Sequence, residues 1–151
     1  NFYLAATFQD ANGNRPFAGS AFTNFVGTIG STVGSATPEW KGILNTTWDV
    51  NTPWGELSIA HRLQYIQSMA AFDTTGGVGL GTPTIIYHNL FASLNPFEHV
   101  QIFAGVNNLL DRQPPVYTGI YGAQAGIQAN TDPSTFDVIG RYFFGGVKLR
   151  Y

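Results

Sequence analysis

Three histidines and nine acidic residues carry this chain's capacity for acid–base chemistry or metal binding. His61, His88 and His99 lack the spacing of metal ligands, and the acidic residues form no pair at a fixed separation. No Gly-x-Ser-x-Gly motif supplies a nucleophile, and no helix is expected after the glycines of 72–83 to complete a phosphate site. Since the chain also has no cysteine, the sequence predicts no enzyme, no metal site and no cofactor.

Tyrosine, amide and carboxylate side chains gather in the long polar segment 108–135. Tyrosine rings stack on planar or ring-shaped solutes, and amides both donate and accept hydrogen bonds, so the combination suits a sugar or a siderophore. The alternative is an ordinary loop held by its own aromatic residues. The candidate ligand-binding residues are Tyr117, Tyr121, Gln124, Gln128, Asn130 and Asp132.

The elements that hold this segment have the pattern of strands with two unlike faces. At the end of the sequence, Val147, Leu149 and Tyr151 alternate with Lys148 and Arg150. Successive side chains of a strand point to opposite sides, so one face is apolar and the other cationic. A strand that is apolar outside, polar inside and closed by an aromatic residue is typical of a transmembrane β-barrel.

The same alternation predicts about six strands and an antiparallel arrangement. Short connectors at 51–54 and 95–97 alternate with long ones at 11–37, 72–83 and 108–135. Outer-membrane barrels have short turns on the periplasmic side and longer loops outside, so we expect the long connectors to face outward. The expected strands cover approximately residues 1–10, 38–50, 55–71, 84–95, 98–107 and 136–151.

Composition limits the classes of protein to which the chain can belong. Its 151 residues suffice for one domain, and 11% of them are charged, against roughly 25% in a typical soluble domain. No apolar run approaches the roughly 18 residues of a membrane helix. The net charge of −2 gives no basic footprint for nucleic acid. Strands with one face in lipid fit this composition, and so does a secreted β-sandwich.

Trp40 and Trp48 share one face of the second expected strand. At roughly 3.3 Å per residue and a tilt of about 40°, they lie about 20 Å apart along the membrane normal, which suits the two aromatic girdles of an apolar band about 25 Å tall. We expect Trp40, Trp48 and Tyr151 to belong to these girdles. His61 has the parity of the apolar face, where a polar ring is unfavourable, so we expect a bulge or a different register there.

About six strands cannot close a barrel, because the smallest bacterial barrels have about eight. An open sheet would leave unpaired backbone groups in lipid. The rest of the barrel must therefore come from missing sequence or from other chains. We expect missing sequence, with residues 1–151 forming one portion of a single barrel domain.

Two segments resemble the C-terminal end of TonB-dependent outer-membrane receptors. Residues 105–115 read GVNNLLDRQPP, and residues 136–144 read FDVIGRYFF and lead into the terminal strand. The similarity is closest over 84–151 and extends to 38–71, with Phe136 where the family commonly has tyrosine. The residues that carry the motif are Asn107, Asn108, Leu109, Asp111, Asp137, Gly140, Arg141 and Tyr151.

The resemblance implies a barrel of about 22 strands around a plug domain that is absent from this sequence. It implies active uptake of a scarce solute, such as a siderophore, cobalamin or an oligosaccharide, across the bacterial outer membrane. The implied partners are the rest of the barrel and its plug, the TonB complex acting through a missing N-terminal region, outer-membrane lipid, the barrel assembly machinery and the solute itself.

The motif also has a physical interpretation as scaffold. Asn107 and Asn108 suit a turn because asparagine side chains bond to nearby backbone, and Gly140 permits a bulge or a close backbone approach. We expect Asp111 and Arg112 to form an ion pair in the loop. Two alternatives stay open: a porin-like or adhesin barrel that does not use TonB, and a soluble carbohydrate-binding sandwich with Trp40, Trp48 and Tyr151 in its core.

Overall fold

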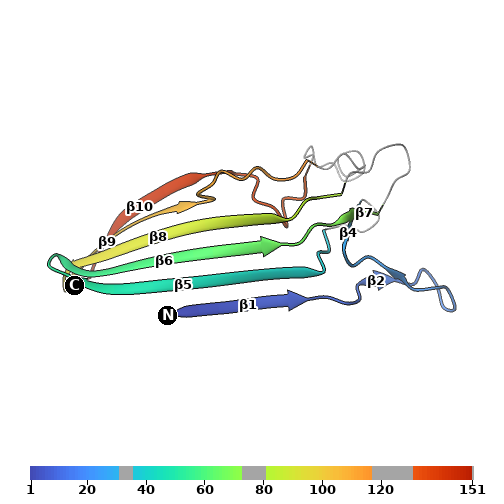
Figure 1. Ribbon diagram of the computed structural model, residues 1–151, viewed down its shortest axis with the longest axis horizontal. Coiled ribbons are helices and arrows are strands. Elements are labelled where there is room, and N and C mark those ends of the chain that lie inside the picture. The colour runs from blue at the N-terminus through green and yellow to red at the C-terminus, as the bar shows by residue number, and fades with distance from the viewer. Residues whose placement is uncertain (31–35, 73–80, 117–130, 151) are drawn as a thin grey trace.

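A six-stranded antiparallel sheet dominates the computed structural model, which describes residues 1–30, 36–72, 81–116 and 131–150 (Figure 1). No helix long and apolar enough to cross a membrane occurs among these residues. The strands follow the order β1-β5-β6-β8-β9-β10 across the sheet. Their bounds are β1 Phe2–Phe8, β5 Trp40–Thr52, β6 Gly55–Ile66, β8 Ile85–Phe97, β9 Val100–Asn107 and β10 Tyr142–Leu149.

The connectors alternate in length as the sequence predicts, which confirms an all-β antiparallel architecture. Pro53 and Trp54 join β5 to β6, and Glu98 and His99 join β8 to β9, at the same end of the sheet (Figure 1). The short connector expected at 95–97 is therefore wrong in position, because β8 continues to Phe97. The described parts of the three long connectors lie at the opposite end. We call these the turn end and the loop end. Since every neighbouring pair of long strands is antiparallel, all long connectors necessarily meet at one end.

The predicted bounds of two strands are wrong at the loop end. The strand expected over 55–71 ends at Ile66, and the strand expected over 136–151 begins at Tyr142. Residues 132–140 form turns instead, with the Phe136 amide donating to the carbonyl oxygen of Asp132 and with Gly140 at a φ of 80°. This positive φ breaks an extended strand, and glycine adopts it at little cost.

Two small sheets in the connectors were not predicted. β2 (Gly13–Asn14) pairs with β3 (Thr23–Asn24), and β4 (Thr28–Ile29) pairs in parallel with β7 (Ala70–Ala71). The second of these lies beside an apolar cluster at the loop end. That cluster, the main buried core of the described chain, contains Ile29, Ile66, Met69, Ile85, Tyr87 and Phe136.

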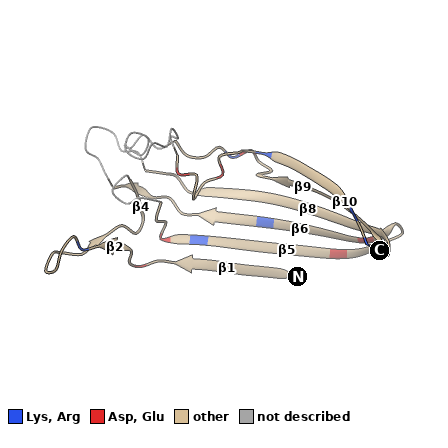
Figure 2. Cartoon of the chain, turned by 180° about the vertical axis from the view of Figure 1, so that it is seen from behind, with Lys and Arg blue, Asp and Glu red and all other residues tan. Residues whose placement is uncertain are grey.

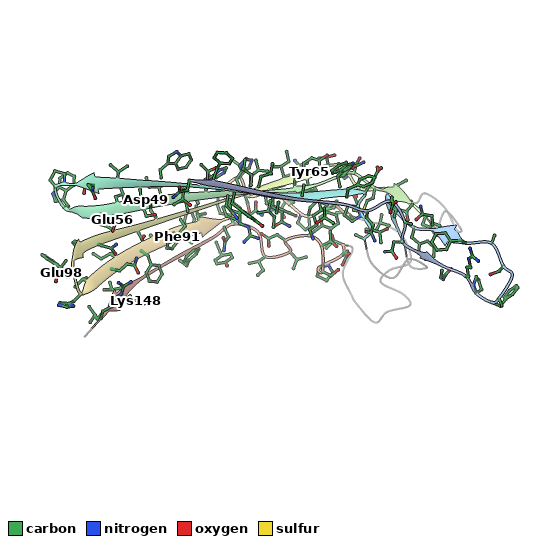
Figure 3. The ribbon with its side chains drawn as sticks, turned by 90° about the horizontal axis from the view of Figure 1, so that it is seen from below. Asp49, Glu56, Tyr65, Phe91, Glu98 and Lys148 are labelled. Atoms are coloured by element: carbon green, nitrogen blue, oxygen red, sulfur yellow. The ribbon has the colours of Figure 1, made fainter. Side chains whose placement is uncertain are left out.

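Cross-strand pairing divides the six-stranded sheet into two unlike faces. Directly paired residues share a face, and the register runs from Trp48 through Ile59, Ala92 and Ala104 to Gly145. We call this side the apolar face. In Figure 3, Phe91 and Lys148 lie on the side of the sheet opposite to Tyr65, and this second side we call the polar face.

Large hydrophobic residues of the apolar face are exposed on β1, β5, β8, β9 and β10, and those of β6 are half-buried. Phe2 is 82% exposed, Trp48 52% and Leu149 66%, although each is a large hydrophobic residue. The two predicted girdle residues Trp40 and Trp48 lie on this face at 45% and 52% exposure, and Tyr151 lies outside the described residues. No second sheet covers this face in the part of the chain that the structure describes.

Candidate functional site

All charged side chains of the six strands belong to the polar face. Asp49 pairs with Ser58, and Glu56 pairs with Asn95, so each acid lies beside a polar neighbour. The apolar face has no charged residue within these strands, and Figure 2 shows how few charges the strands hold. The charged residues of the strands are Lys41, Asp49, Glu56, Arg62 and Lys148.

Two adjoining hollows of about 390 Å³ and 380 Å³ lie near the middle of the polar face. Both are lined by Arg62, Asn89 and Asn107, which come from β6, β8 and β9. We call the two together the mid-sheet hollow. The strand register explains the grouping, since Arg62 pairs directly with Asn89, and Asn107 pairs with Tyr142.

Several polar side chains of the mid-sheet hollow have no hydrogen-bond or ion-pair partner among the described residues. Asn89 uses its Oδ1 to accept from the Asn108 amide at 2.8 Å, which leaves its NH₂ group to donate elsewhere. Half-exposed amides and a guanidinium in this state can bind a solute or water. The side chains without such a partner are those of Asn45, Arg62, Gln64, Asn107 and Tyr142.

An aromatic series crosses the polar face beside these groups. The Phe91 ring lies 6.1 Å from that of Phe103 and 6.3 Å from that of Phe144, the latter at an interplanar angle of 22°. Tyr142 extends the series, with its ring 6.1 Å from Phe144. Phe91, Phe144 and Tyr142 line the mid-sheet hollow, so it combines planar apolar surface with unpaired hydrogen-bonding groups.

Two of these rings lie over glycines of the neighbouring strand. Gly105 pairs with Phe144, and a Cβ on Gly105 would lie 2.4 Å from the tip of the Phe144 ring. Gly146 pairs with Phe103, and its Cβ would lie 2.8 Å from that ring. An aromatic ring that covers a cross-strand glycine is a known way to stabilise a sheet.

Asn108 stabilises a tight turn within the first motif segment. It is 1% exposed with a φ of 50°, and its side chain accepts from the Arg112 amide at 2.7 Å and donates to the Arg112 carbonyl at 2.9 Å. Asparagine tolerates this left-handed conformation better than most residues. Asp111 forms no ion pair with Arg112, so that expectation is wrong; its carboxylate accepts instead from the Arg141 amide at 3.0 Å.

The second motif segment bonds to the first and to the sheet. The Arg141 guanidinium donates to the Leu109 carbonyl at 3.4 Å, and a Cβ on Gly140 would lie 3.2 Å from Asp111 Oδ1. The Asp137 amide donates to the Tyr87 hydroxyl at 3.1 Å. We call this network the clamp. It holds Asp137 against the mid-sheet hollow, which that residue lines.

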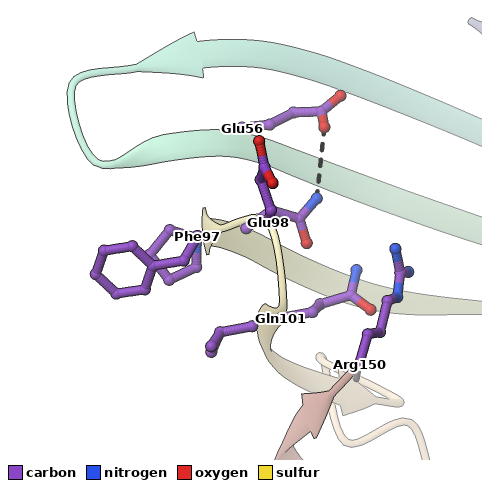
Figure 4. A pocket seen from close by; sticks show the side chains of 8 residues that line it. Glu56, Phe97, Glu98, Gln101 and Arg150 are labelled. Carbon is purple, nitrogen blue, oxygen red and sulfur yellow. Dashed lines mark hydrogen bonds between the residues drawn. The ribbon is translucent and has the colours of Figure 1, made fainter.

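A further hollow of about 570 Å³ lies at the turn end (Figure 4). Glu56, Glu98 and Arg150 bring charges of both signs to it, and Asn95 donates to Glu56 at 3.4 Å. The Arg150 amide donates to the His99 carbonyl at 2.9 Å, and His99 is exposed, as expected for a residue beside a short turn. Acids and base separated across an open hollow suit solvent or a protein surface better than catalysis.

His61 lies on the apolar face without the bulge or register change that the sequence predicts. It pairs with Leu90 in an unbroken ladder, and its Nε2 lies 3.0 Å from Nδ1 of His88. The ring centroids lie 5.3 Å apart and the ring planes differ by 19°, so the two rings meet edge to edge. One nitrogen of each imidazole thus bonds to the other ring, which lowers the cost of two polar rings on an apolar surface. No group of three potential metal ligands occurs among the described residues.

Of the predicted loop ligands, Tyr117, Tyr121, Gln124, Gln128 and Asn130 lie outside the described residues. Asp132 is described and is 4% exposed. Its carboxylate accepts from the Ala36 amide at 2.9 Å, the Ser134 amide at 2.9 Å and the Thr135 hydroxyl at 2.9 Å.

Burial alone would raise the pKa of Asp132. The hydrogen bonds from Ser134, Ala36 and Thr135 outweigh it and hold the pKa below its usual value. In this arrangement Asp132 joins two connectors, because it accepts from Ala36 in one and from Ser134 and Thr135 in the other.

Sequence reasoning placed Arg62 on the polar face but gave no weight to Asn89, Phe91, Phe144 or Tyr142 as site residues. The sequence did indicate these residues, because they are amide and aromatic residues at the alternate strand positions that point to the polar face. Comparisons of this chain with protein-family models, with curated proteins and with solved structures give no match.

Proposed function

We propose that this chain forms part of the wall of a β-barrel that spans the bacterial outer membrane and takes up a solute. One observation carries the proposal: a six-stranded sheet exposes an uncharged apolar face while every strand charge lies on the other face. Water strongly disfavours such a surface, whereas lipid suits it. A soluble sandwich would need a second sheet over Trp40 and Trp48.

The free edges of the sheet support a larger barrel. β1 and β10 each pair on one side only within the described residues. Unpaired backbone amides and carbonyls in hydrocarbon cost several kcal/mol each, so in a membrane both edges must meet further strands. We propose that these come from the same polypeptide and complete a barrel of about 22 strands.

The two motif segments favour a TonB-dependent receptor within the class of barrels. The segments 105–115 and 136–144 resemble that family, and they meet in the clamp through Asp111 and Arg141. The proposed activity is energised uptake of a scarce solute such as a siderophore, cobalamin or an oligosaccharide. The alternative is a porin-like barrel that conducts passively.

Lipid contact is tested with single-tryptophan variants of the full-length polypeptide in vesicles of brominated lipid. Variants that keep only Trp40 or only Trp48 should be quenched, each most strongly by bromine near an interface. The variant that keeps only Trp54, in the turn between β5 and β6, serves as the shallow control. A polypeptide that stays monomeric in water without detergent, with Trp40 and Trp48 unquenched, would contradict the proposal.

Energy coupling is tested by uptake into cells that express the full-length polypeptide. Uptake of a labelled solute panel should stop when a protonophore collapses the proton-motive force. Uptake that continues at its initial rate would favour the passive porin.

A further inference from the structure

We propose that the mid-sheet hollow is a subsite for a neutral carbohydrate, which it binds by stacking a sugar ring on Phe144 and by hydrogen bonds from Arg62 and Asn107. This inference rests on the proposed uptake function and names its substrate class. It is carried by the aromatic series, by the unpaired polar groups beside it and by the charge of the hollow.

The aromatic series presents ring surface toward the hollow. The Phe144 ring is seated over Gly105, where a Cβ would collide with it at 2.4 Å. Phe144 remains 37% exposed and Phe91 36%, so their uncovered surface adjoins the hollow. The planes of these two rings differ by 22°, and their centroids lie 6.3 Å apart. The C–H faces of a sugar ring are apolar and pack on such a surface.

The polar groups of the hollow match the edges of a sugar ring. Arg62 and Tyr142 supply N–H and O–H donors, and the amides of Asn107 and Gln64 both donate and accept. Vicinal hydroxyls need donors and acceptors together, since each hydroxyl does both. The hollow places these groups within the same wall as Phe91 and Phe144, so one ligand can use both kinds of contact.

Charge favours a neutral ligand over an anionic chelate. Arg62 is the one lysine or arginine lining the mid-sheet hollow among the described residues, beside the imidazole of His61, and Asp137 is the one acid. Asp137 accepts from the Ile139 amide at 2.9 Å, which leaves its charge near Arg62. A polyanionic ligand requires several cations in close array, and this hollow does not supply them.

The test uses the full-length polypeptide in detergent and a panel of maltohexaose, cellohexaose and a ferric catecholate siderophore, with affinity measured by calorimetry. At least one hexasaccharide should bind, and Phe144→Leu should weaken it about 2- to 10-fold, because the apolar volume stays and the planar face is lost. Phe144→Tyr keeps the face and should retain affinity. Arg62→Gln should also weaken binding.

Phe143→Leu is the matched control, because Phe143 lies next in β10 on the apolar face at 74% exposure. It should leave affinity unchanged. Equal losses from Phe143→Leu and Phe144→Leu, or binding of the siderophore alone, would overturn the carbohydrate subsite. Each variant is first checked for heat-modifiable migration in a gel. If Phe144→Leu does not fold, Arg62→Gln decides the question, and affinity unchanged by that substitution would overturn the subsite. Failure here leaves the lipid-quenching and uptake results intact, so the two proposals fail separately.

Discussion

The two faces of the sheet solve opposite problems with the same strands. On the apolar face, polar groups are few, and the two imidazoles of His61 and His88 bond to each other. On the polar face, polar groups are many, and several around Arg62 have no partner among the described residues. A surface with few polar groups suits an apolar medium, and a surface with many available ones suits water or a ligand.

The largest effect should come from a charge on the apolar face. Leu44 lies on that face midway between Trp40 and Trp48, and it pairs with Leu63. Leu44→Arg should cost about 2–4 kcal/mol of the free energy of unfolding in lipid, as arginine does near a bilayer midplane. Urea unfolding of the full-length polypeptide in vesicles measures it.

The control for Leu44→Arg is Ser58→Arg, on the polar face of the neighbouring strand β6. There the new guanidinium meets Asp49, which now accepts from Ser58 at 2.6 Å. The expected change is within about 0.5 kcal/mol. Equal costs at the two positions would break the distinction between the faces.

The next effect belongs to the clamp. Asn108→Ala removes two side-chain hydrogen bonds and forces alanine to a φ of 50°, at a cost of about 2–3 kcal/mol. Asn108→Gly loses the same bonds but tolerates the backbone, so it should cost about 1 kcal/mol less. Amide exchange across 108–112 should rise more for alanine. Identical unfolding midpoints for the two variants would show that the conformation of residue 108 does not matter.

Asp132 should give the protein an acid-sensitive component of stability. Its folded pKa is lowered from the usual 3.8, so the unfolded state binds more protons and stability rises with pH through this window. The contribution is complete above the unfolded value and is lost as pH falls through the folded pKa. Asp132→Asn should lower stability near neutral pH and flatten the acid limb. An unchanged slope of unfolding midpoint against pH below about 4 would contradict this.

The smallest effect should come from the histidine pair. His61→Leu leaves His88 without its hydrogen bond and should cost about 0.5–1.5 kcal/mol. The double variant with His88→Leu removes both polar groups, so it should recover most of that loss in lipid. The unfolding free energies of the two single variants and the double variant measure their coupling. Additive losses would mean that the pair is not a unit.

The sequence predicted the strands and their faces well because parity is a local property. Alternation assigned Lys41 and Trp48 to opposite sides without knowledge of any neighbour. It could not predict the bond between His61 and His88, which depends on His61 lying opposite Leu90. A register shifted by two residues, with His61 opposite Ala92, keeps every residue on its face and separates the histidines, so the apolar pattern alone does not choose between the two registers.

The candidate site was less accessible than the fold for a similar reason. Arg62 and Asn107 were assigned to the polar face or to the motif, but the hollow between them requires three strands in register. The motif interpreted as scaffold was informative, since Asn108 and Asp111 indeed hold the clamp. The early start expected for β10 was wrong because alternation persists into 136–141, where the clamp and the positive φ of Gly140 override it.

β9 and β10 each place a glycine opposite a phenylalanine of the other strand, and these two pairs fix the register of β10. Phe144 is seated over Gly105 and Phe103 over Gly146. A slip of two residues would leave both faces intact, so hydrophobicity cannot forbid it. Such a slip sets Phe144 opposite Phe103 or Asn107, where side chains occupy the space that bare backbone provides in the native pairing. The residues of β10 therefore determine its own register against β9.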